Sequence, residues 1–251
     1  MPTIRVPELV IPELPWNVIR RRLLERWDVR QVAHHSVMGQ VGSGKSFLAR
    51  HGILDTCRYD FVLFIDAKGD DSTLEGLGKV VNRYPSRALR AQRRSYHGDK
   101  PGVQWYRLVT SHRWEIAKEQ VSEALTMVMM EGDCIVVTDE LRAITDARVP
   151  GLGCRAEWEA IRLRGRSRGI GQVDLTQEPR WVPGSFYTQS SFYWVSRVED
   201  ELAQKRIAEI GSSRGLMQHL PTVPKRKWIY TDYLDDERFW AYTQVPARGS
   251  H

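Results

Sequence analysis

The residues of this chain best suited to chemistry lie in one glycine-rich segment at positions 39–46, which reads GQVGSGKS. The segment fits the phosphate-binding pattern G-x-x-x-x-G-K-[ST], whose glycines let successive backbone N–H groups turn inward toward an anion. In this pattern Lys45 reaches the β- and γ-phosphates of ATP, and the Ser46 hydroxyl holds Mg²⁺. The helix expected to start near Lys45 adds its positive dipole end. We therefore predict that ATP is bound by Gly39, Gln40, Val41, Gly42, Ser43, Gly44, Lys45, Ser46 and Phe47.

A pair of acids, Asp139 and Glu140, follows an apolar run at 134–137. Two acids after a strand more often mark an ordinary polar turn, but the phosphate-binding segment earlier in the chain favours a catalytic pair. We expect Asp139 to bind the Mg²⁺ shell, usually through water. Glu140 is expected to polarise the water that attacks the γ-phosphate. A glutamate in this place is typical of proteins that hydrolyse ATP repeatedly.

Four arginines, Arg162, Arg164, Arg166 and Arg168, precede a predicted strand that ends near Gln177. An arginine close to a γ-phosphate neutralises the negative charge that builds up in the transition state. A glutamine at a strand end can sense the same phosphate. We expect Arg162 and Arg164 to form a solvated basic helix end, and either Arg166 or Arg168 to act in catalysis together with Gln177.

The composition limits the class of protein. A chain of 251 residues with 41% hydrophobic residues can form one large α/β domain with a small appendage. The net charge of +6 is compatible with a polyanionic partner without requiring one. Cys57, Cys134 and Cys154 have no metal-ligand spacing, and their odd number without a signal peptide predicts a reducing cytoplasm, bacterial or virus-infected. No apolar run approaches the roughly 18 residues that span a bilayer.

Strands should alternate with helices along the chain. Apolar runs predict strands at 35–38, 61–65, 103–109, 134–137, 171–176 and 192–195. Helical periodicity predicts helices at 17–27, 47–54, 114–130, 156–163 and 201–210. Because several strands are apolar on both faces, we predict an α/β fold with a mainly parallel central sheet and helices on both faces. Aromatic-rich segments at 228–230 and 239–242 predict a hairpin or a closing edge strand.

Four blocks of sequence occur in an order that resembles the FtsK–HerA superfamily of DNA-pumping ATPases. They are GQVGSGKS at 39–46, FIDAKG at 64–69, VTDEL at 137–141, and GRSRGI at 165–170 followed by LTQEP at 175–179. The resemblance covers roughly residues 32 to 212 and implies a RecA-like core of the P-loop NTPase class. It also implies a homo-oligomeric ring, hexameric or pentameric, around double-stranded DNA.

The resemblance assigns roles to individual positions. Arg166 falls where the family carries an arginine donated to the neighbouring subunit's site, and Gln177 falls on the family's sensor glutamine. Asp66 and Lys68 match a recurrent pair for which we have no chemical role. The chain shows no winged-helix module, membrane anchor or nuclease constellation, which favours the small viral or plasmid members. A portal or anchor protein is then a possible separate partner.

The domain organisation follows from these matches. We predict an N-terminal arm and helix, an ATPase core, a C-terminal extension with aromatic strands, and the remnant of a purification tag, at residues 1–31, 32–212, 213–246 and 247–251.

A ring motor needs sequence-neutral contacts to DNA phosphates from basic loops. The long glycine-containing segment after Glu140 supplies two candidates, Arg148 and Arg155. A second basic cluster between residues 83 and 100 places Arg83, Arg87, Arg90 and Arg94 on one helix face, for which a solvated face is the first expectation and contact with DNA or an acidic partner the alternative.

Other residues have less specific signals. His34 and His35 have no cysteine or acid at ligand spacing, so we expect them to be structural. Trp16, Tyr84 and Tyr193 are candidates for stacking on the adenine base, and the sequence does not choose among them.

Three functions remain open, and the sequence favours them in the following order. The first is a ring-forming, ATP-driven double-stranded DNA translocase for genome packaging or DNA transfer. The second is an ATPase that drives phage assembly or protein secretion, as in the related Zot-like proteins of filamentous phages. The third is a small-molecule phosphotransferase, which would need an acceptor pocket and would not depend on Glu140.

Overall fold

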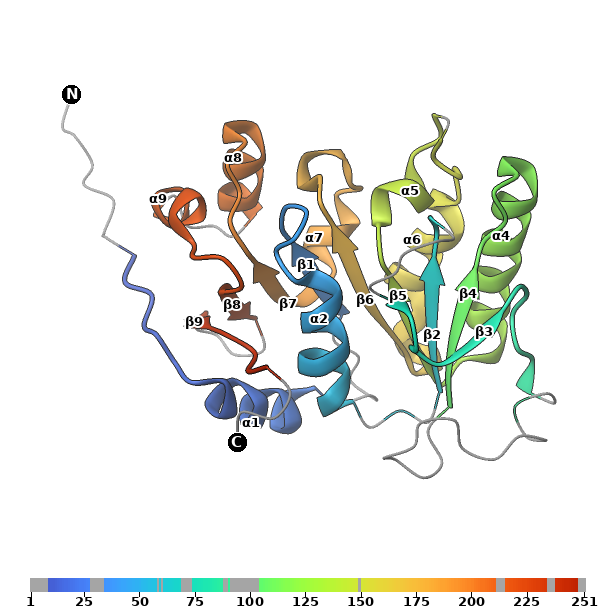
Figure 1. The fold of residues 1–251 in the computed structure, drawn as a ribbon, viewed down its shortest axis with the longest axis horizontal. Coiled ribbons are helices and arrows are strands. Elements are labelled where there is room, and N and C mark those ends of the chain that lie inside the picture. Colours follow the sequence, from blue (N-terminus) through green and yellow to red (C-terminus); the bar gives the residue numbers. More distant parts are fainter. Residues whose placement is uncertain are drawn as a thin grey trace.

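The computed structural model of the protein describes residues 9–27, 34–57, 59, 61–68, 74–87, 90, 104–148, 150–210, 215–233 and 238–247. The strands in these ranges form one nine-stranded sheet (Figure 1). In chain order they are β1 (His34–Met38), β2 (Phe61–Asp66), β3 (Lys79–Val81), β4 (Gln104–Val109), β5 (Cys134–Thr138), β6 (Ile170–Thr176), β7 (Ser190–Val195), β8 (Trp228–Asp232) and β9 (Phe239–Thr243). Across the sheet the order is β3-β4-β2-β5-β6-β1-β7-β8-β9.

The sheet is mainly parallel, as predicted. All neighbours from β3 to β7 pair in parallel. The two aromatic segments form β8 and β9, which pair antiparallel and close one edge of the sheet, so the predicted hairpin is confirmed. The other edge strand, β3, was not predicted, because three residues, of which the central Val80 is exposed, are too few to show a periodicity.

The longer predicted helices are confirmed as α1 (Trp16–Arg26), α4 (Trp114–Glu131), α6 (Arg155–Arg164) and α8 (Glu201–Ile210). The helix expected at 47–54 is present as α2 (Lys45–Phe47), a wider π-type turn (Leu48–Ile53) and a 3₁₀ turn (Leu54–Thr56). Three short helices lie in connections where none was predicted: α5 (Leu141–Thr145), α7 (Ser185–Thr188) and α9 (Leu216–His219). Within the described ranges, no helix combines the length and apolar character that crossing a bilayer requires.

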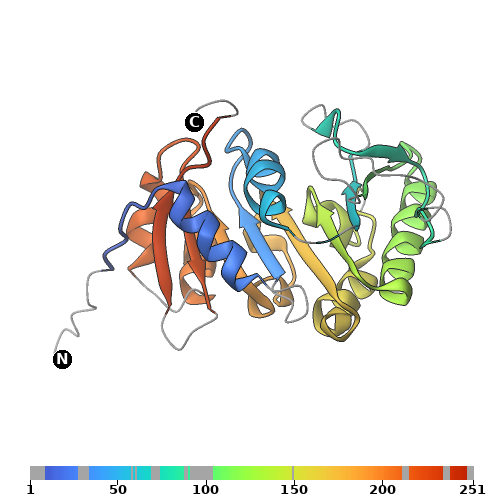
Figure 2. The same ribbon diagram turned by 90° about the horizontal axis from the view of Figure 1, so that it is seen from below.

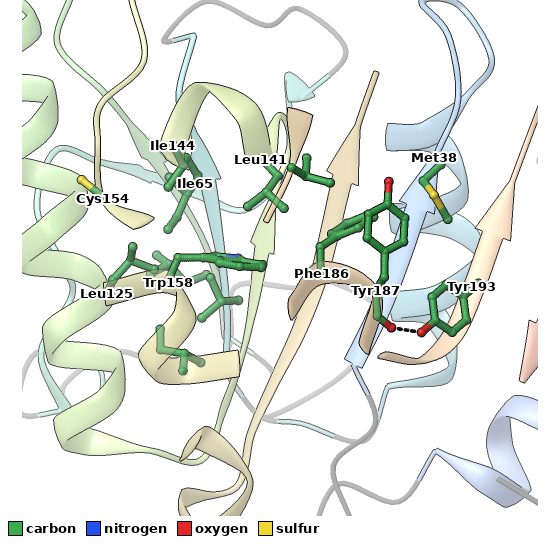
Figure 3. Packing of buried hydrophobic residues seen from close by; sticks show 14 of the residues in the cluster. Met38, Ile65, Leu125, Leu141, Ile144, Cys154, Trp158, Phe186, Tyr187 and Tyr193 are labelled. Atoms are coloured by element: carbon green, nitrogen blue, oxygen red, sulfur yellow. Dashed lines mark hydrogen bonds between the residues drawn. The ribbon is translucent and has the colours of Figure 1, made fainter. Parts of the chain in front are cut away.

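Alternate strand residues supply two hydrophobic cores, one on each face of the sheet. On β2, Val62 and Phe64 join the core covered by α1 and α2. Leu63 and Ile65 join the core covered by α4 and α6, where Trp158 is one of the large buried side chains (Figure 3). Figure 2 shows α1 and α2 on one side of the sheet and α6 on the other. The predicted α/β arrangement with helices on both faces is therefore confirmed.

Segments from both ends of the chain pack against the helix that follows the phosphate-binding loop. Gly52 lies in this helix, and a Cβ at this position would be 3.1 Å from both Trp16 Cη2 of α1 and Val245 Cγ2. Arg22 of α1 forms an ion pair with the buried Asp232 of β8. The segment before α1 forms backbone hydrogen bonds with β9. The described part of the N-terminal arm thus covers its own chain.

Arg162 is buried, and the prediction that it belongs to a solvated helix end is wrong. Its Nη1 donates to Asp174 Oδ2 of β6 at 2.8 Å, and its Nη2 donates to Ser36 Oγ and Phe186 O, each at 2.9 Å. The residue lies four positions after Trp158, on the same inward face of α6, because residues i and i+4 of a helix are neighbours. Because further arginines follow Arg162 at every second position, the sequence did not indicate that its side chain points inward.

Much of the second basic cluster, including Arg94, lies outside the described residues. Arg90 is described, and the predicted solvated face is wrong for it. Its guanidinium lies 3.7 Å from the centre of the Phe61 ring, and its Nη2 is 2.6 Å from Glu131 Oε2. Arg87 donates to the backbone oxygen of Glu131 at 2.9 Å. These two cations therefore fix the end of α4.

Both predicted structural histidines are buried in β1 and hydrogen-bonded. His34 Nδ1 accepts from the backbone N–H of Gln172 at 3.2 Å, and His35 Nδ1 accepts from Trp194 Nε1 at 3.2 Å. Burial lowers the pKa of both imidazoles well below the usual value. Cys134 is a buried thiol, and burial raises its pKa to about 12.

The two buried histidines should make folding stability depend on pH. The unfolded chain takes up protons at His34 and His35 below about pH 6.5, whereas the folded chain does not, so stability is complete above that pH and is lost as pH falls. We expect the free energy of unfolding in urea to decrease by up to about 1.4 kcal/mol per histidine for each pH unit below 6.5. The dependence should flatten in a His34→Gln/His35→Gln variant and persist in His112→Gln, whose side chain is exposed. An unchanged slope in the double variant would contradict this origin.

Candidate nucleotide-binding site

The predicted catalytic segments meet because three neighbouring parallel strands end at the same edge of the sheet. The phosphate-binding loop follows β1, the two acids follow β5, and Gln177 follows β6, which lies between them. The loop is joined to this edge by the backbone N–H of Gly39, which donates to Thr176 O at 3.2 Å. The order of strands therefore brings together residues that lie far apart in the sequence.

The phosphate-binding loop has the shape and the polar groups that an oxyanion requires. Gly42 and Gly44 have φ angles of +73° and +90°, a left-handed conformation that glycine adopts without strain. Lys45 Nζ donates to Gly39 O at 2.9 Å and to Gln40 O at 3.0 Å, so the ammonium group is held over the loop. The buried Ser43 Oγ has no hydrogen-bond partner within the described chain. A bound phosphate would satisfy this hydroxyl, which supports the fit of the loop to a nucleotide.

Ser46 and Asp139 lie together, as a shared metal site requires. Ser46 Oγ donates to Asp139 Oδ1 at 2.9 Å, and Asp139 is 7% exposed. A hydroxyl and a carboxylate oxygen suit Mg²⁺, a hard cation that is commonly held by one or two protein oxygens, substrate phosphates and waters. The described residues contain no cluster of three or more His, Cys, Asp or Glu side chains that would suggest another kind of metal site.

Glu140 is buried and held by β6. Its Oε1 accepts from Thr176 Oγ1 and its Oε2 accepts from the backbone N–H of Gln177, each at 3.2 Å. Burial raises the pKa of Glu140, while the charges of Lys45 and Lys68 oppose that increase. A carboxylate with a raised pKa is a better proton acceptor near neutral pH than an exposed one.

A cavity of about 640 Å³ opens beside these groups. The phosphate-binding loop, Asp139, Gln177 and Lys68 border it on one side. Residues near the end of the chain also border it, and the sequence had not indicated them: Arg226, Trp228, Gln244, Val245 and Ala247. Nothing in the local sequence marks these residues, since their approach depends on the pairing of β8 with β9 at the edge of the sheet.

None of the three aromatic residues considered for the adenine base borders this cavity. Trp16 lies 6.1 Å from Trp194, measured between ring centroids. Tyr84 donates to Glu131 near the amino ends of the strands, and Tyr193 donates to Tyr187 O in the core. Each of the three is therefore engaged elsewhere in the fold.

Arg166 and Arg168 lie at the amino ends of the strands, whereas the phosphate-binding loop lies at their carboxyl ends. Both belong to the 3₁₀ turn at Gly165–Arg168, immediately before β6. Because β6 has seven residues, this turn is about 20 Å from Gln177 along the strand. Arg168 Nη1 donates to Met130 O at 3.1 Å, whereas the exposed Arg166 side chain contacts no acceptor among the described residues.

The remaining sequence candidates divide into structural and exposed groups. Asp66 is buried and accepts from Arg107 Nη2 at 2.6 Å, so it ties β2 to β4. Arg148 is exposed and pairs with Asp146 at 3.0 Å, and its guanidinium lies 5.6 Å from the Trp181 ring. Arg155 is exposed at the start of α6 and pairs with Glu159.

No protein-family model matches the chain. Among curated proteins, it is 23% identical over 209 residues to the DNA packaging ATPase P9 of Enterobacteria phage PRD1, which covers 79% of this chain and 80% of the phage protein. The match therefore extends over most of both proteins, well beyond the short motifs.

Solved structures share the fold. The genome packaging NTPase B204 of Sulfolobus turreted icosahedral virus 2, in complex with ATP-gammaS, superimposes with a TM-score of 0.58 at 12% identity and covers 86% of this chain and 99% of its own. VirB4 of Thermoanaerobacter pseudethanolicus superimposes with a TM-score of 0.59 at 10% identity and covers 90% and 92%. At these identities the likeness establishes the P-loop ATPase fold.

The contact between Ser46 and Asp139 predicts how the site depends on Mg²⁺. We expect Asp139→Asn to raise the Mg²⁺ concentration needed for half-maximal ATP binding about tenfold or more, because one anionic ligand or partner of the ion is lost. A titration with a fluorescent ATP analogue would measure this. Asp133→Asn, at the exposed opposite edge, is the control and should leave the Mg²⁺ dependence unchanged. Equal dependence in both variants would exclude Asp139 from metal binding.

The order of the motifs, their meeting at one edge of a parallel sheet, and the similarity in sequence and fold agree with one another. They confirm the resemblance recognised from the four sequence blocks. The chain is similar in sequence to a viral DNA packaging ATPase and shares the fold of P-loop ATPases, viral genome-packaging ATPases among them.

Proposed function

We propose that this protein hydrolyses ATP in a ring of identical subunits and uses the energy to move double-stranded DNA, as in genome packaging. The observation that carries the proposal is the position of Glu140, whose buried carboxylate is held by Thr176 and Gln177 beside the phosphate-binding loop and Asp139. The similarity to a DNA packaging ATPase of phage PRD1 supports DNA packaging as the process that ATP hydrolysis drives.

The residues of the site divide the work of hydrolysis. Glu140 accepts a proton from the attacking water, and the raised pKa suits this task. Lys45 and the loop N–H groups stabilise the negative charge of the phosphates. Mg²⁺, held through Ser46 and Asp139, supplies further charge neutralisation when it is bound. The backbone of Gln177 contacts the Glu140 carboxylate, so a change at the γ-phosphate can pass directly into β6.

The placement of Arg166 supports a shared site between subunits. A side chain at the amino end of β6 cannot reach the phosphates bound at the carboxyl end of the same sheet. The arginine predicted to act in catalysis would therefore serve a neighbouring subunit, and Arg166 suits this better than Arg168, which is bonded to α4. In a ring of such subunits, each ATP site receives one Arg166 side chain from its neighbour.

DNA contact is assigned to exposed cations near the carboxyl edge of the sheet. Arg148 lies in the segment after α5, and its guanidinium, like those of Arg142 and Arg180, lies within 6 Å of the Trp181 ring. Arg155 lies at the start of α6. Binding through such cations should weaken steeply with salt and show little sequence preference. An ATPase for protein assembly or secretion would not bind DNA in this way, so gel shifts over a salt series separate the two functions.

Glu140→Gln should abolish turnover but spare nucleotide binding. The amide keeps the size of the side chain and one of its two acceptor oxygens but cannot accept the proton, so we expect kcat to fall about 10²- to 10⁴-fold. Phosphate release at low salt, with and without double-stranded DNA, measures this, and DNA should stimulate the unmodified protein. Glu209→Gln on the exposed face of α8 is the control. Hydrolysis that does not respond to DNA would contradict the motor function.

Mixing two inactive variants tests the shared site. Arg166→Ala removes the proposed donor and Lys45→Ala removes the phosphate-binding cation, so each alone should lose at least about 10³-fold in kcat. In an equal mixture, about a quarter of the sites combine an intact Lys45 with an intact neighbouring Arg166, and activity should reappear accordingly. Arg164→Ala is the matched control and should retain activity. A mixture that stays inactive, or a fully active Arg166→Ala protein, would remove Arg166 from this role.

A further inference from the structure

The nucleotide cavity is larger than the phosphate-binding loop needs. Its volume of about 640 Å³ falls within the usual range for pockets that bury a drug-sized ligand. The triphosphate occupies the side formed by the loop and Lys45, so the nucleoside must extend along another wall. The C-terminal extension forms one such wall, through residues that flank the β8–β9 pair.

Arg226 reaches this wall from a turn with an unusual backbone. The turn is closed by the N–H of Lys227, which donates to Pro224 O at 3.0 Å, and Arg226 has a φ of +65°. Among the described residues, only Asp133 shares a positive φ without being glycine. An arginine in this conformation costs folding free energy that a glycine would not, and such residues gather at functional sites. Arg226 is one of the residues that line the cavity.

Gln244 lies next to this turn because of the strand register. Trp228 at the start of β8 pairs with Thr243 at the end of β9, so Arg226 and Gln244 leave the sheet at the same end. Gln244 is exposed and borders the cavity. Its amide has both a donor and an acceptor, the pair that adenine presents at N6 and N7. A planar guanidinium can stack on the face of the same base.

We propose that the C-terminal extension forms the subsite for the base of the nucleotide, with the Arg226 guanidinium stacked on the purine and the Gln244 amide reading its edge. This inference rests on the ATP binding in the proposed function but does not depend on DNA movement. In this proposal, the residues that select the nucleotide lie outside the four sequence blocks that resemble other ATPases. Adenine is the base that a glutamine amide fits with two hydrogen bonds.

The test compares ATP with inorganic tripolyphosphate, which lacks the nucleoside. Arg226→Gly suits the backbone conformation, so the protein should fold and its melting temperature should stay the same or rise. We expect its Kd for ATP, measured by calorimetry, to increase about five- to tenfold while its Kd for tripolyphosphate is unchanged. Lys225→Ala, in the same turn but away from the cavity, is the matched control and should bind both ligands normally.

Gln244→Ala tests the recognition of the base edge. We expect the unmodified protein to prefer ATP over GTP and this variant to lose most of that preference, because the amide no longer distinguishes the two purines. Equal weakening of ATP and tripolyphosphate in Arg226→Gly would place Arg226 on the phosphates and overturn the inference. Unchanged ATP binding in both variants would also overturn it. If the unmodified protein binds neither ATP nor tripolyphosphate, the proposed function is wrong, and so is the proposed subsite.

Discussion

One buried ion pair, between Arg162 and Asp174, sets the geometry of both ends of the catalytic apparatus. Asp174 also accepts from Thr138 Oγ1 at 2.7 Å and Trp158 Nε1 at 3.2 Å, so one carboxylate joins β5, β6 and α6. Thr138 directly precedes Asp139, while Arg162 lies just before the turn that carries Arg166. Losing either charge would leave the other buried without compensation, at a cost of several kcal/mol. The acids of the site and the turn that carries the proposed donor to the next subunit are therefore tied to the same buried carboxylate.

The sequence predicted those parts of the molecule whose structure is determined locally. The glycine-rich loop needs left-handed backbone at Gly42 and Gly44, and this requirement is visible in the residue types. Strands buried on both faces read as apolar runs, and they showed that the sheet is parallel. Once a sheet is parallel, the carboxyl ends of its strands lie on the same side, and the observed pairing of β5 with β6 then places Glu140 beside Gln177.

Features that depend on long-range register could not be predicted. The position of Arg162 on the inward face of α6 was masked by arginines on either side, and its partner is on a different element. The aromatic candidates for the base were chosen by type, but Tyr84 and Tyr193 are core residues whose hydroxyls have partners. The wall formed by Arg226 and Gln244 exists only because β8 and β9 pair at the far edge of the sheet. Their proximity depends on the pairing of the two strands and not on a local sequence pattern.

The close approach at Gly52 has a practical consequence for anyone who trims this protein. Trp16 and Val245 come from opposite ends of the chain, and a methyl group added at Gly52 would lie 3.1 Å from a carbon atom of each, so both side chains would have to shift. Both side chains pack against the helical segment that begins at Lys45. A shortened form that lacks either terminus would expose hydrocarbon there and loosen the mounting of the loop. Minimal fragments drawn from motif boundaries alone would therefore be poor substitutes for a chain that keeps both segments.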